Sequence, residues 1–187
     1  MNIASGLMLF LYGCRCVETK ITPPLALGET NILLIINCTL RADRLERYGY
    51  SVPSSPHWLE WTKKGITFDG HIAQAPWTRP SLGSIMTGHY PRYLGLDNPA
   101  DSGSFELVLQ EQIQTIAELF QQQNYYTIGA VGNPNAKAQF GLAQGFESYH
   151  EPDKTFRERT RLPNTEELTD FILREQRGKK VVFAQLI

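Results

Sequence analysis

The stretch APWTRPSLGSIMTGHYP, at residues 75–91, holds the side chain best placed for chemistry, the hydroxyl of Thr78. Pro80 predicts the first position of a helix, because proline fixes φ near the helical value and lacks the amide hydrogen that a first turn does not use. The Thr78 hydroxyl would then lie just outside a helix N-terminus, which suits a phosphate, a sulfate or the oxyanion of a group under attack. Without other information, the residues favour an ordinary capped helix with Thr78 as a surface hydroxyl.

A second candidate site follows the apolar run NILLIIN at residues 31–37, which indicates a parallel strand buried on both faces. Folds of the α/β class place their chemistry at the carboxyl end of such strands, here Cys38-Thr-Leu-Arg-Ala-Asp. A neutral thiol is a poor ligand for Ca²⁺ or Mg²⁺, so Cys38 is expected to be a small buried residue rather than a ligand. Arg41 could bind a substrate anion, although an ion pair with Asp43 or Glu46 is favoured.

A third candidate segment, Gly132-Asn-Pro-Asn135, follows a run of β-forming residues at 125–132 that predicts another buried strand. Asn133 and Asn135 can donate hydrogen bonds, but an asparagine supplies neither charge nor a general acid or base. On the sequence alone, a role in a turn is the stronger interpretation of both asparagines.

The order Thr-x-Pro-Ser-x-x-Ser-x-x-Thr-Gly-x-Tyr-Pro resembles the nucleophile motif of the sulfatase family, in the alkaline-phosphatase-like superfamily. In that motif the first residue is a cysteine or serine that is oxidised to formylglycine, and Thr78 stands in its place. Leu82 stands in the place of the motif's arginine. The segments 38–50 and 115–146 resemble the family as well.

The resemblance implies a Ca²⁺ or Mg²⁺ cofactor, with Cys38 at the position of a metal-binding aspartate. It also places Asn133 and Asn135 where the family carries a lysine and a histidine that hold the sulfate, and so makes them, with Arg41, candidate substrate-binding residues. Oxidation of Thr78 would give a ketone, so the residue cannot become formylglycine. The threonine alkoxide would instead attack directly, as in the phosphoethanolamine and phosphoglycerol transferases of the superfamily.

The function expected from the resemblance is metal-dependent hydrolysis of a sulfate or phosphate ester by a nucleophile at Thr78. Two alternatives remain open, a phosphoryl or phosphodiester transferase or hydrolase that uses the threonine alkoxide, and a catalytically inactive relative. The expected substrate is a small-molecule, glycan or lipid ester.

Composition favours a soluble globular protein over a disordered or nucleic-acid-binding one, since 42% of the 187 residues are hydrophobic, 20% are charged and the net charge is -1. Residues 1–30 are expected to be a leader and linker, because an apolar run at 3–12 has the length of a signal-peptide core and Gly13-Cys14 resembles a lipoprotein signal. A disordered or packed N-terminal tail is the alternative interpretation of the same residues. The leader predicts the cell envelope, periplasmic or extracellular, with a membrane contact only through a lipid anchor.

The remaining patterns predict the elements that position these residues. Helices are expected at 56–64, where Trp58 and Trp61 would be core residues, and at 115–124 and 164–179; short strands are expected at 66–73 and 181–187. The leucine-containing segment 94–111 is expected to be an exposed loop. Alternating strands and helices predict an α/β fold with a mostly parallel sheet covered by helices on both faces. Residues 31–187 are expected to be the N-terminal part of a sulfatase domain that is inactive alone.

Overall fold

The computed structural model describes residues 30–97, 107–151, 165–179 and 182–186. The predicted leader therefore lies outside the described residues, apart from Thr30. Within the described part of the chain, no helix is long and apolar enough to span a bilayer.

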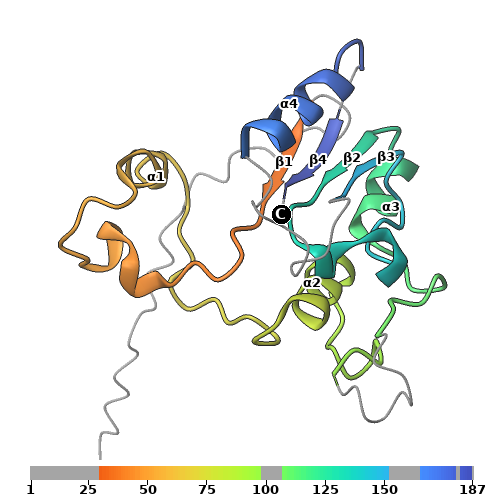
Figure 1. Cartoon of the computed structure of the whole chain (residues 1–187), viewed down its shortest axis with the longest axis horizontal. Coiled ribbons are helices and arrows are strands. Elements are labelled where there is room, and N and C mark those ends of the chain that lie inside the picture. The colour runs from red at the N-terminus through yellow and green to blue at the C-terminus, as the bar shows by residue number, and fades with distance from the viewer. Residues whose placement is uncertain (1–29, 98–106, 152–164, 180–181, 187) are drawn as a thin grey trace, which may run out of the picture.

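The centre of the fold is a four-stranded parallel sheet (Figure 1). Its strands are β1 (Ile32–Ile35), β2 (Tyr126–Ala130), β3 (Ser148–His150) and β4 (Val182–Leu186), in the order β1-β4-β2-β3. The predicted parallel α/β fold is thus confirmed, as are three of its predicted strands. β3 was not predicted, because three residues with the sequence SYH carry no strand pattern and are ordered by pairing with β2.

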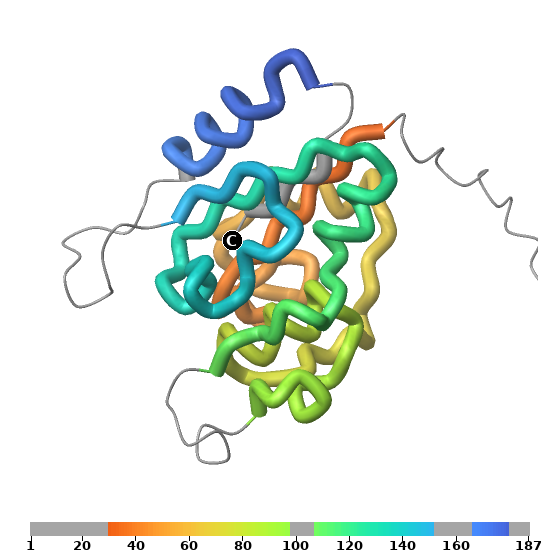
Figure 2. Tube along the Cα trace, turned by 90° about the vertical axis from the view of Figure 1, so that its right-hand side faces the viewer, coloured from red at the N-terminus to blue at the C-terminus, as the bar shows by residue number. Residues whose placement is uncertain are grey.

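Helices cover both faces of the sheet (Figures 1 and 2). On one side α4 (Thr165–Glu175) packs Leu168 and Ile172 against Ile128 and Ala130 of β2. The opposite face is covered by α2 (Thr78–Thr87) and α3 (Ile116–Gln122), from which Met86 and Ala117 pack near Tyr125. Four short 3-10 helices complete the connections, η1 (Ala42–Arg44), η2 (Glu46–Tyr48), η3 (Pro134–Ala136) and η4 (Ala138–Phe140).

The start of α3 is a capping box, which accounts for the helix predicted at 115–124. Thr115 accepts a hydrogen bond from the Glu118 amide at 3.2 Å, and the Glu118 carboxylate accepts from the Thr115 amide at 2.8 Å. Gln144 joins this pair, because its side chain donates to Glu118 at 2.9 Å. The box therefore also fixes the loop that precedes β3.

The segment 94–111 is not the exposed loop that its polar pattern suggested. Its leucines are buried in the core beneath α2, and residues 98–106 lie outside the described part. Gly83 makes this packing possible, since a Cβ there would lie 2.5 Å from the Leu96 Cδ1. The buried leucines are Leu94, Leu96, Leu107 and Leu109.

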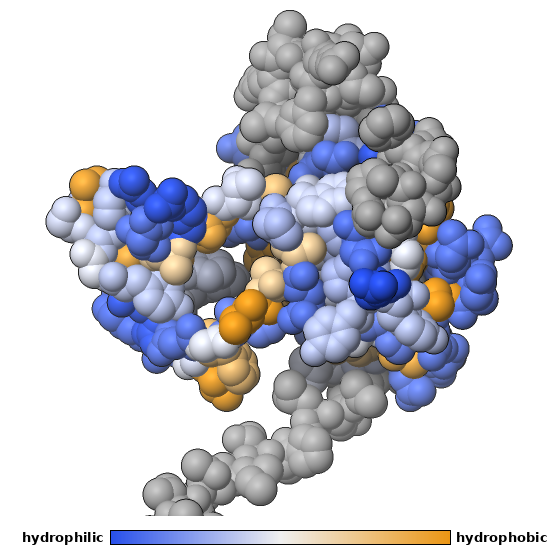
Figure 3. All heavy atoms as spheres, turned by 90° about the horizontal axis from the view of Figure 1, so that it is seen from below, coloured by the Kyte–Doolittle hydropathy of each residue, from blue (hydrophilic) through white to orange (hydrophobic). Residues whose placement is uncertain are grey.

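The region between the first strand and α2 departs furthest from expectation. Residues 66–73 form no strand, and α1 (Pro56–Thr62) has no buried residue, so Trp58 and Trp61 are exposed rather than core. The helix lies to one side of the sheet (Figure 1), and Figure 3 shows apolar side chains in orange on the surface of this part of the molecule. We call residues 48–77 the apolar arm, because most of the large exposed hydrophobic side chains in the described residues belong to it.

Candidate functional site

Three of the residues singled out from the sequence meet at the carboxyl end of the sheet. The Asn133 Nδ2 lies 3.3 Å from the Thr78 Oγ1 and 3.5 Å from the Cys38 Sγ. Cys38 follows β1, Asn133 follows β2, and Thr78 begins α2. The topology of a parallel sheet accounts for the meeting, since the carboxyl ends of all its strands lie at one edge, although β4 lies between β1 and β2.

The orientation of the Asn133 carboxamide is fixed by its own turn. Its Oδ1 accepts a hydrogen bond from the backbone N–H of Asn135 at 2.9 Å, and a backbone N–H can only donate. The amide nitrogen therefore points toward Thr78 and Cys38, as a donor. Asn133 is buried. Its side chain has two contacts: the oxygen holds the predicted turn, and the nitrogen lies beside the hydroxyl of the candidate nucleophile, Thr78.

Thr78 is the first residue of α2 rather than a residue outside it. Trp77 has extended dihedrals, φ -144° and ψ 165°, and occupies the cap, so the helix begins two residues before Pro80. Proline is tolerated at this third position because first-turn amides have no partner within the helix. The half-buried Thr78 hydroxyl stays at the helix N-terminus, as the sequence predicted.

Cys38 is exposed, so the expectation that it is a buried residue is wrong. The chain turns sharply just after it, since Thr39 has a φ of 61°, a strained value for a β-branched residue. The Thr39 hydroxyl donates to the Cys38 carbonyl at 2.7 Å, which helps to hold the turn. The thiol is thus exposed beside a sharp turn, within 3.5 Å of the Asn133 Nδ2.

Arg79 is a site residue that the sequence analysis missed. Its Nη2 lies 3.5 Å from the Asn135 Oδ1, and its guanidinium carbon lies 3.5 Å from the centre of the Phe140 ring. The available signal was a cation directly after the candidate nucleophile. Leu82, by contrast, is 3% exposed and packs in the core, so no side chain at that position faces the site.

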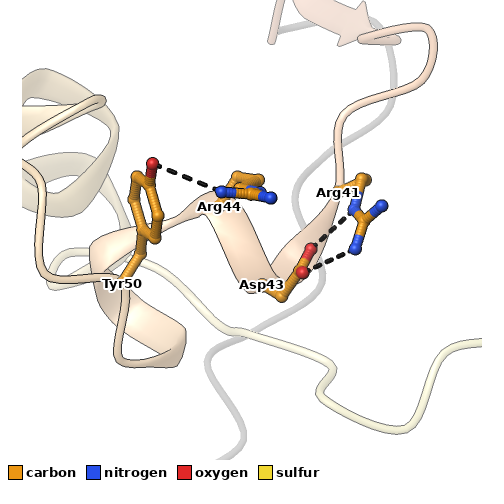
Figure 4. Close-up of polar contacts among 4 residues, drawn as sticks. All are labelled: Arg41, Asp43, Arg44 and Tyr50. Atoms are coloured by element: carbon orange, nitrogen blue, oxygen red, sulfur yellow. Dashed lines mark hydrogen bonds and ion pairs between the residues drawn. The ribbon is translucent and has the colours of Figure 1, made fainter.

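Arg41 forms a bidentate ion pair with Asp43, with distances of 2.8 and 2.7 Å (Figure 4). The hydrogen bonds from Arg41 lower the pKa of Asp43, and those to Asp43 raise the pKa of Arg41. Figure 4 also shows Arg44 beside the Tyr50 hydroxyl, at 3.4 Å. Within the described residues no hydrogen bond joins Arg41 to Thr78 or Asn133, and its contact with a substrate stays a prediction.

A pocket of about 460 Å³ runs along α2, beside the segment 71–74. Ser81 and Ile85 line it, and they share a helix face with Thr78 by their spacing of three and seven residues. Its other walls are mixed. Ile72, Ala73, Gly88 and Tyr90 are apolar or aromatic, and His71, Gln74, Ser84 and His89 are polar.

A family model described as Sulfatase matches residues 30–186, which are most of the chain. The chain belongs to the sulfatase family. No curated protein matches the sequence.

Two solved structures share the fold of this sulfatase-family chain. One, of BT4656 in complex with its substrate D-glucosamine-2-N,6-O-disulfate, has a TM-score of 0.65 and 18% identity, and the alignment covers 84% of this chain and 33% of that one. The other, a phosphonate monoester hydrolase of Agrobacterium radiobacter, has a TM-score of 0.63 and 14% identity, with coverage of 84% and 40%. This chain thus spans well under half the length of either structure.

Sulfatases generally use a divalent metal ion, but the described residues do not fit the expected Ca²⁺ or Mg²⁺. Among them, no three His, Cys, Asp or Glu side chains are placed to hold an ion together. Hard cations require several oxygen ligands, whereas this cluster offers one soft thiol, one hydroxyl and one carboxamide. Cys38 in particular cannot replace the carboxylate that the family resemblance placed there.

Proposed function

We propose that this sulfatase-family chain binds a sulfate or phosphate ester at the carboxyl end of its sheet and cleaves it with the Thr78 oxygen as nucleophile. The observation that carries the proposal is the Asn133 amide donor 3.3 Å from the Thr78 Oγ1. A hydrogen bond donated to that oxygen stabilises its alkoxide more than its neutral hydroxyl, and so favours the attacking form.

The chemistry takes two steps. The Thr78 Oγ1 gives up its proton to solvent and attacks sulfur or phosphorus in line, forming an Oγ1–S or Oγ1–P bond while the bond to the leaving alcohol breaks. The leaving alkoxide takes a proton from water. A water molecule then hydrolyses the threonine ester and restores the hydroxyl; a monoester substrate releases inorganic sulfate or phosphate, and a phosphodiester releases a phosphate monoester.

The substrate is an ester with an anionic head and an apolar or glycan body. A sulfated sugar and a phosphonate monoester are the compound classes named with the two structural relatives, and both carry such a head. The pocket along α2 supports a place for the body, because its lining begins one turn after Thr78.

Binding without turnover is the second candidate. It is favoured by the neutral surroundings of Thr78, since no carboxylate or imidazole hydrogen-bonds to its hydroxyl among the described residues. Such a site would hold the anion and lack a general base.

The test is to assay the full chain with 4-nitrophenyl sulfate and bis(4-nitrophenyl) phosphate, each with a chelator and with added Ca²⁺ or Mg²⁺. Thr78→Ala should abolish turnover, and Thr78→Ser should retain part of it because the hydroxyl remains. Mass spectrometry of the peptide that contains Thr78 should detect a sulfated or phosphorylated residue. Turnover that survives Thr78→Ala would refute the nucleophile, and substrate binding without turnover would establish the second candidate.

We further propose that the protein resides in the cell envelope, anchored through Cys14 of the leader. Fractionation and metabolic labelling with a fatty acid would test this, with Cys14→Ser as the variant that should lose the label. A soluble, unlabelled protein would contradict the anchor.

A further inference from the structure

We propose that Tyr149 is a positioning residue for the candidate site, because its hydroxyl anchors the turn that presents the Asn133 amide to Thr78. The bond that carries the proposal runs from the Tyr149 hydroxyl to the Ala136 carbonyl oxygen, at 2.6 Å. The inference rests on the proposed function for the part that the Asn133 donor plays in cleavage. It adds to the site a residue of β3, a strand that the sequence did not predict.

The anchored turn is η3, which begins directly after Asn133. The Ala136 N–H donates to the Asn133 backbone carbonyl at 2.9 Å, and the Asn135 N–H donates to the Asn133 Oδ1 at the same distance. A 3-10 helix of three residues has few internal bonds, so contacts from outside decide where it lies. Ala136 is fully buried and ends this turn, and a shift of Ala136 therefore shifts Asn133.

The Tyr149 ring is held in place before its hydroxyl makes any bond. Gly129 of β2 and Tyr149 are partners in the pairing of β2 with β3. A Cβ on Gly129 would lie 2.3 Å from the Tyr149 Cδ2, so the ring lies directly against the strand. The ring also packs on the core cluster that contains Ala136, and its centre lies 5.5 Å from that of the Phe146 ring. The fixed ring therefore brings the hydroxyl to one place.

The bond between Tyr149 and Ala136 has a defined direction. A carbonyl oxygen can only accept, so the phenol is the donor. Burial, and to a smaller extent the Glu151 carboxylate, raises the pKa of Tyr149 above its ordinary 10, so the phenol keeps its proton at neutral and moderately alkaline pH. The distance of 2.6 Å lies at the short end of the range for O–H···O bonds. The anchor therefore persists over the pH range of an ordinary assay.

The path from Tyr149 to the nucleophile position has two links. The first is the η3 turn, and the second is the Asn133 Nδ2, 3.3 Å from the Thr78 Oγ1. That distance is already long for an N–H···O bond, and such a bond weakens steeply as its geometry worsens. A small displacement of η3 would therefore take the donor away from Thr78. Within the described residues no hydrogen bond joins Tyr149 to Thr78, so its effect on the reaction runs through Asn133.

Tyr125 offers a matched control at the opposite end of the sheet. It is 2% exposed and directly precedes β2, and its hydroxyl donates to the Thr30 carbonyl at 3.1 Å. Tyr125→Phe thus removes a bond of the same kind, from a buried phenol to a backbone carbonyl. The loss occurs at the amino end of the strands, whereas the candidate site lies at the carboxyl end.

The experiment is amide hydrogen exchange of the full chain, followed by NMR. The Asn135 amide reports on the turn, because it donates to the Asn133 Oδ1, and the Ile128 amide in β2 reports on the sheet. In Tyr149→Phe the exchange of Asn135 relative to that of Ile128 should become about 5- to 100-fold faster, as expected when a buried carbonyl loses its donor. A general loss of stability would accelerate both amides together. Tyr125→Phe should leave the ratio unchanged.

Turnover of 4-nitrophenyl sulfate or bis(4-nitrophenyl) phosphate is the second measurement. Tyr149→Phe should lower kcat about 10-fold and leave KM unchanged, because the Asn133 donor acts on the alkoxide rather than on the bound substrate. In an Asn133→Ala background the same substitution should have no further effect on kcat, since the donor is already absent. Tyr125→Phe should leave kcat unchanged.

An exchange ratio in Tyr149→Phe equal to that of the wild type would overturn the proposal, as would an equal kcat in an active chain. If Tyr149→Phe does not fold by circular dichroism, the wild type decides. Its Tyr149 hydroxyl proton should then give a slowly exchanging NMR signal with a nuclear Overhauser contact to Ala136, and the absence of that signal overturns the proposal. The outcome is separable from the proposed function. A changed exchange ratio in a chain without turnover supports this inference and refutes cleavage, whereas turnover that needs Thr78 but not Tyr149 does the reverse.

Discussion

Asn133 places its amide nitrogen 3.3 Å from the Thr78 Oγ1 across 55 residues of sequence, and its amide oxygen 2.9 Å from the backbone nitrogen of Asn135. One side chain thus closes a turn with one end and faces the candidate nucleophile with the other. The Asn133 carboxamide thus has a structural role in the turn and a proposed chemical role beside Thr78, and substitutions can separate the two.

Asn133→Asp should keep the turn, since a carboxylate oxygen can still accept from the Asn135 amide, but it removes the donor to Thr78. Asn133→Ala removes both contacts. We expect Asn133→Ala to lower the free energy of unfolding by about 1–3 kcal/mol, because the Asn135 amide loses its acceptor, and Asn133→Asp to lower it less. Denaturant unfolding measures both effects. Turnover should fall in both variants, and full turnover in Asn133→Asp would refute the role of the amide donor.

Gly141→Ala should be among the more destabilising single changes in the described chain. Its φ is +76°, and an added Cβ would lie 2.3 Å from the Leu109 carbonyl oxygen. We expect a loss of about 2–3 kcal/mol in the free energy of unfolding. Gly70→Ala is the control, because Gly70 has no atom within 4 Å of an added Cβ, and it should change stability by less than about 1 kcal/mol. Equal melting temperatures for the two variants would contradict this account.

Thr115→Ala tests the capping box. The buried Thr115 hydroxyl accepts from the Glu118 amide and lies 3.1 Å from the Gln144 carbonyl, to which it donates. Its removal should cost about 1–2 kcal/mol of unfolding free energy. Thr115→Ser keeps the hydroxyl and should recover most of that loss in the same denaturant titration. If Thr115→Ser and Thr115→Ala unfold at the same denaturant concentration, the loss of stability comes from the packing of the threonine methyl group instead.

Acid should loosen the attachment of α1. Hydrogen bonds from the Ser55 hydroxyl and then from its backbone N–H, the latter at 2.9 and 3.1 Å, lower the pKa of Glu46 from its ordinary 4.5. Because the pKa of Glu46 is lower in the folded protein than in the unfolded chain, its carboxylate stabilises the fold fully above pH 4.5. This stabilisation is lost as the pH falls through the lower pKa of the folded protein.

The fluorescence of Trp58 and Trp61 should therefore change below pH 4.5 as α1 detaches from η2. Glu46→Gln retains an acceptor oxygen but cannot titrate. In this variant the change of tryptophan fluorescence with pH should be smaller below pH 4.5. Asp43 also has a lowered pKa through Arg41, so its contribution should remain in that variant. An identical profile in Glu46→Gln would assign the transition to other groups.

Much of the fold could be predicted because its elements carry strong local patterns. The apolar runs of β1 and β2 and the capping box of α3 need no tertiary information. β3 and the buried leucines around Leu96 could not be found that way, since a three-residue strand has no period and the leucines depend on the space above Gly83. Trp58 and Trp61 have the spacing of a core face, but the described chain provides no core beside them.

The sequence predicted which residues belong to the candidate site better than it predicted the contacts between them. Thr78, Cys38 and Asn133 follow or precede recognisable elements, so the sheet edge brings them together. The place of Arg79 depends on where α2 begins and on a contact with Phe140, whose position no local pattern gives. The exposure of Cys38 and the positive φ of Thr39 directly after it likewise have no signal in the sequence.

The place of β4 between β1 and β2 has a consequence for synthesis. β1 and β2 pair with β4 and not with each other, so the strand that links them is the last of the four to leave the ribosome. While residues 32–150 are already outside, none of the other described strands can pair with β1, and its edges stay open to other chains. The pairing of β1 with β4 is expected to form slowly, because the loop that it closes spans most of the described chain. A chaperone that shields β1 during translation would therefore raise the yield of native protein more than one added after release.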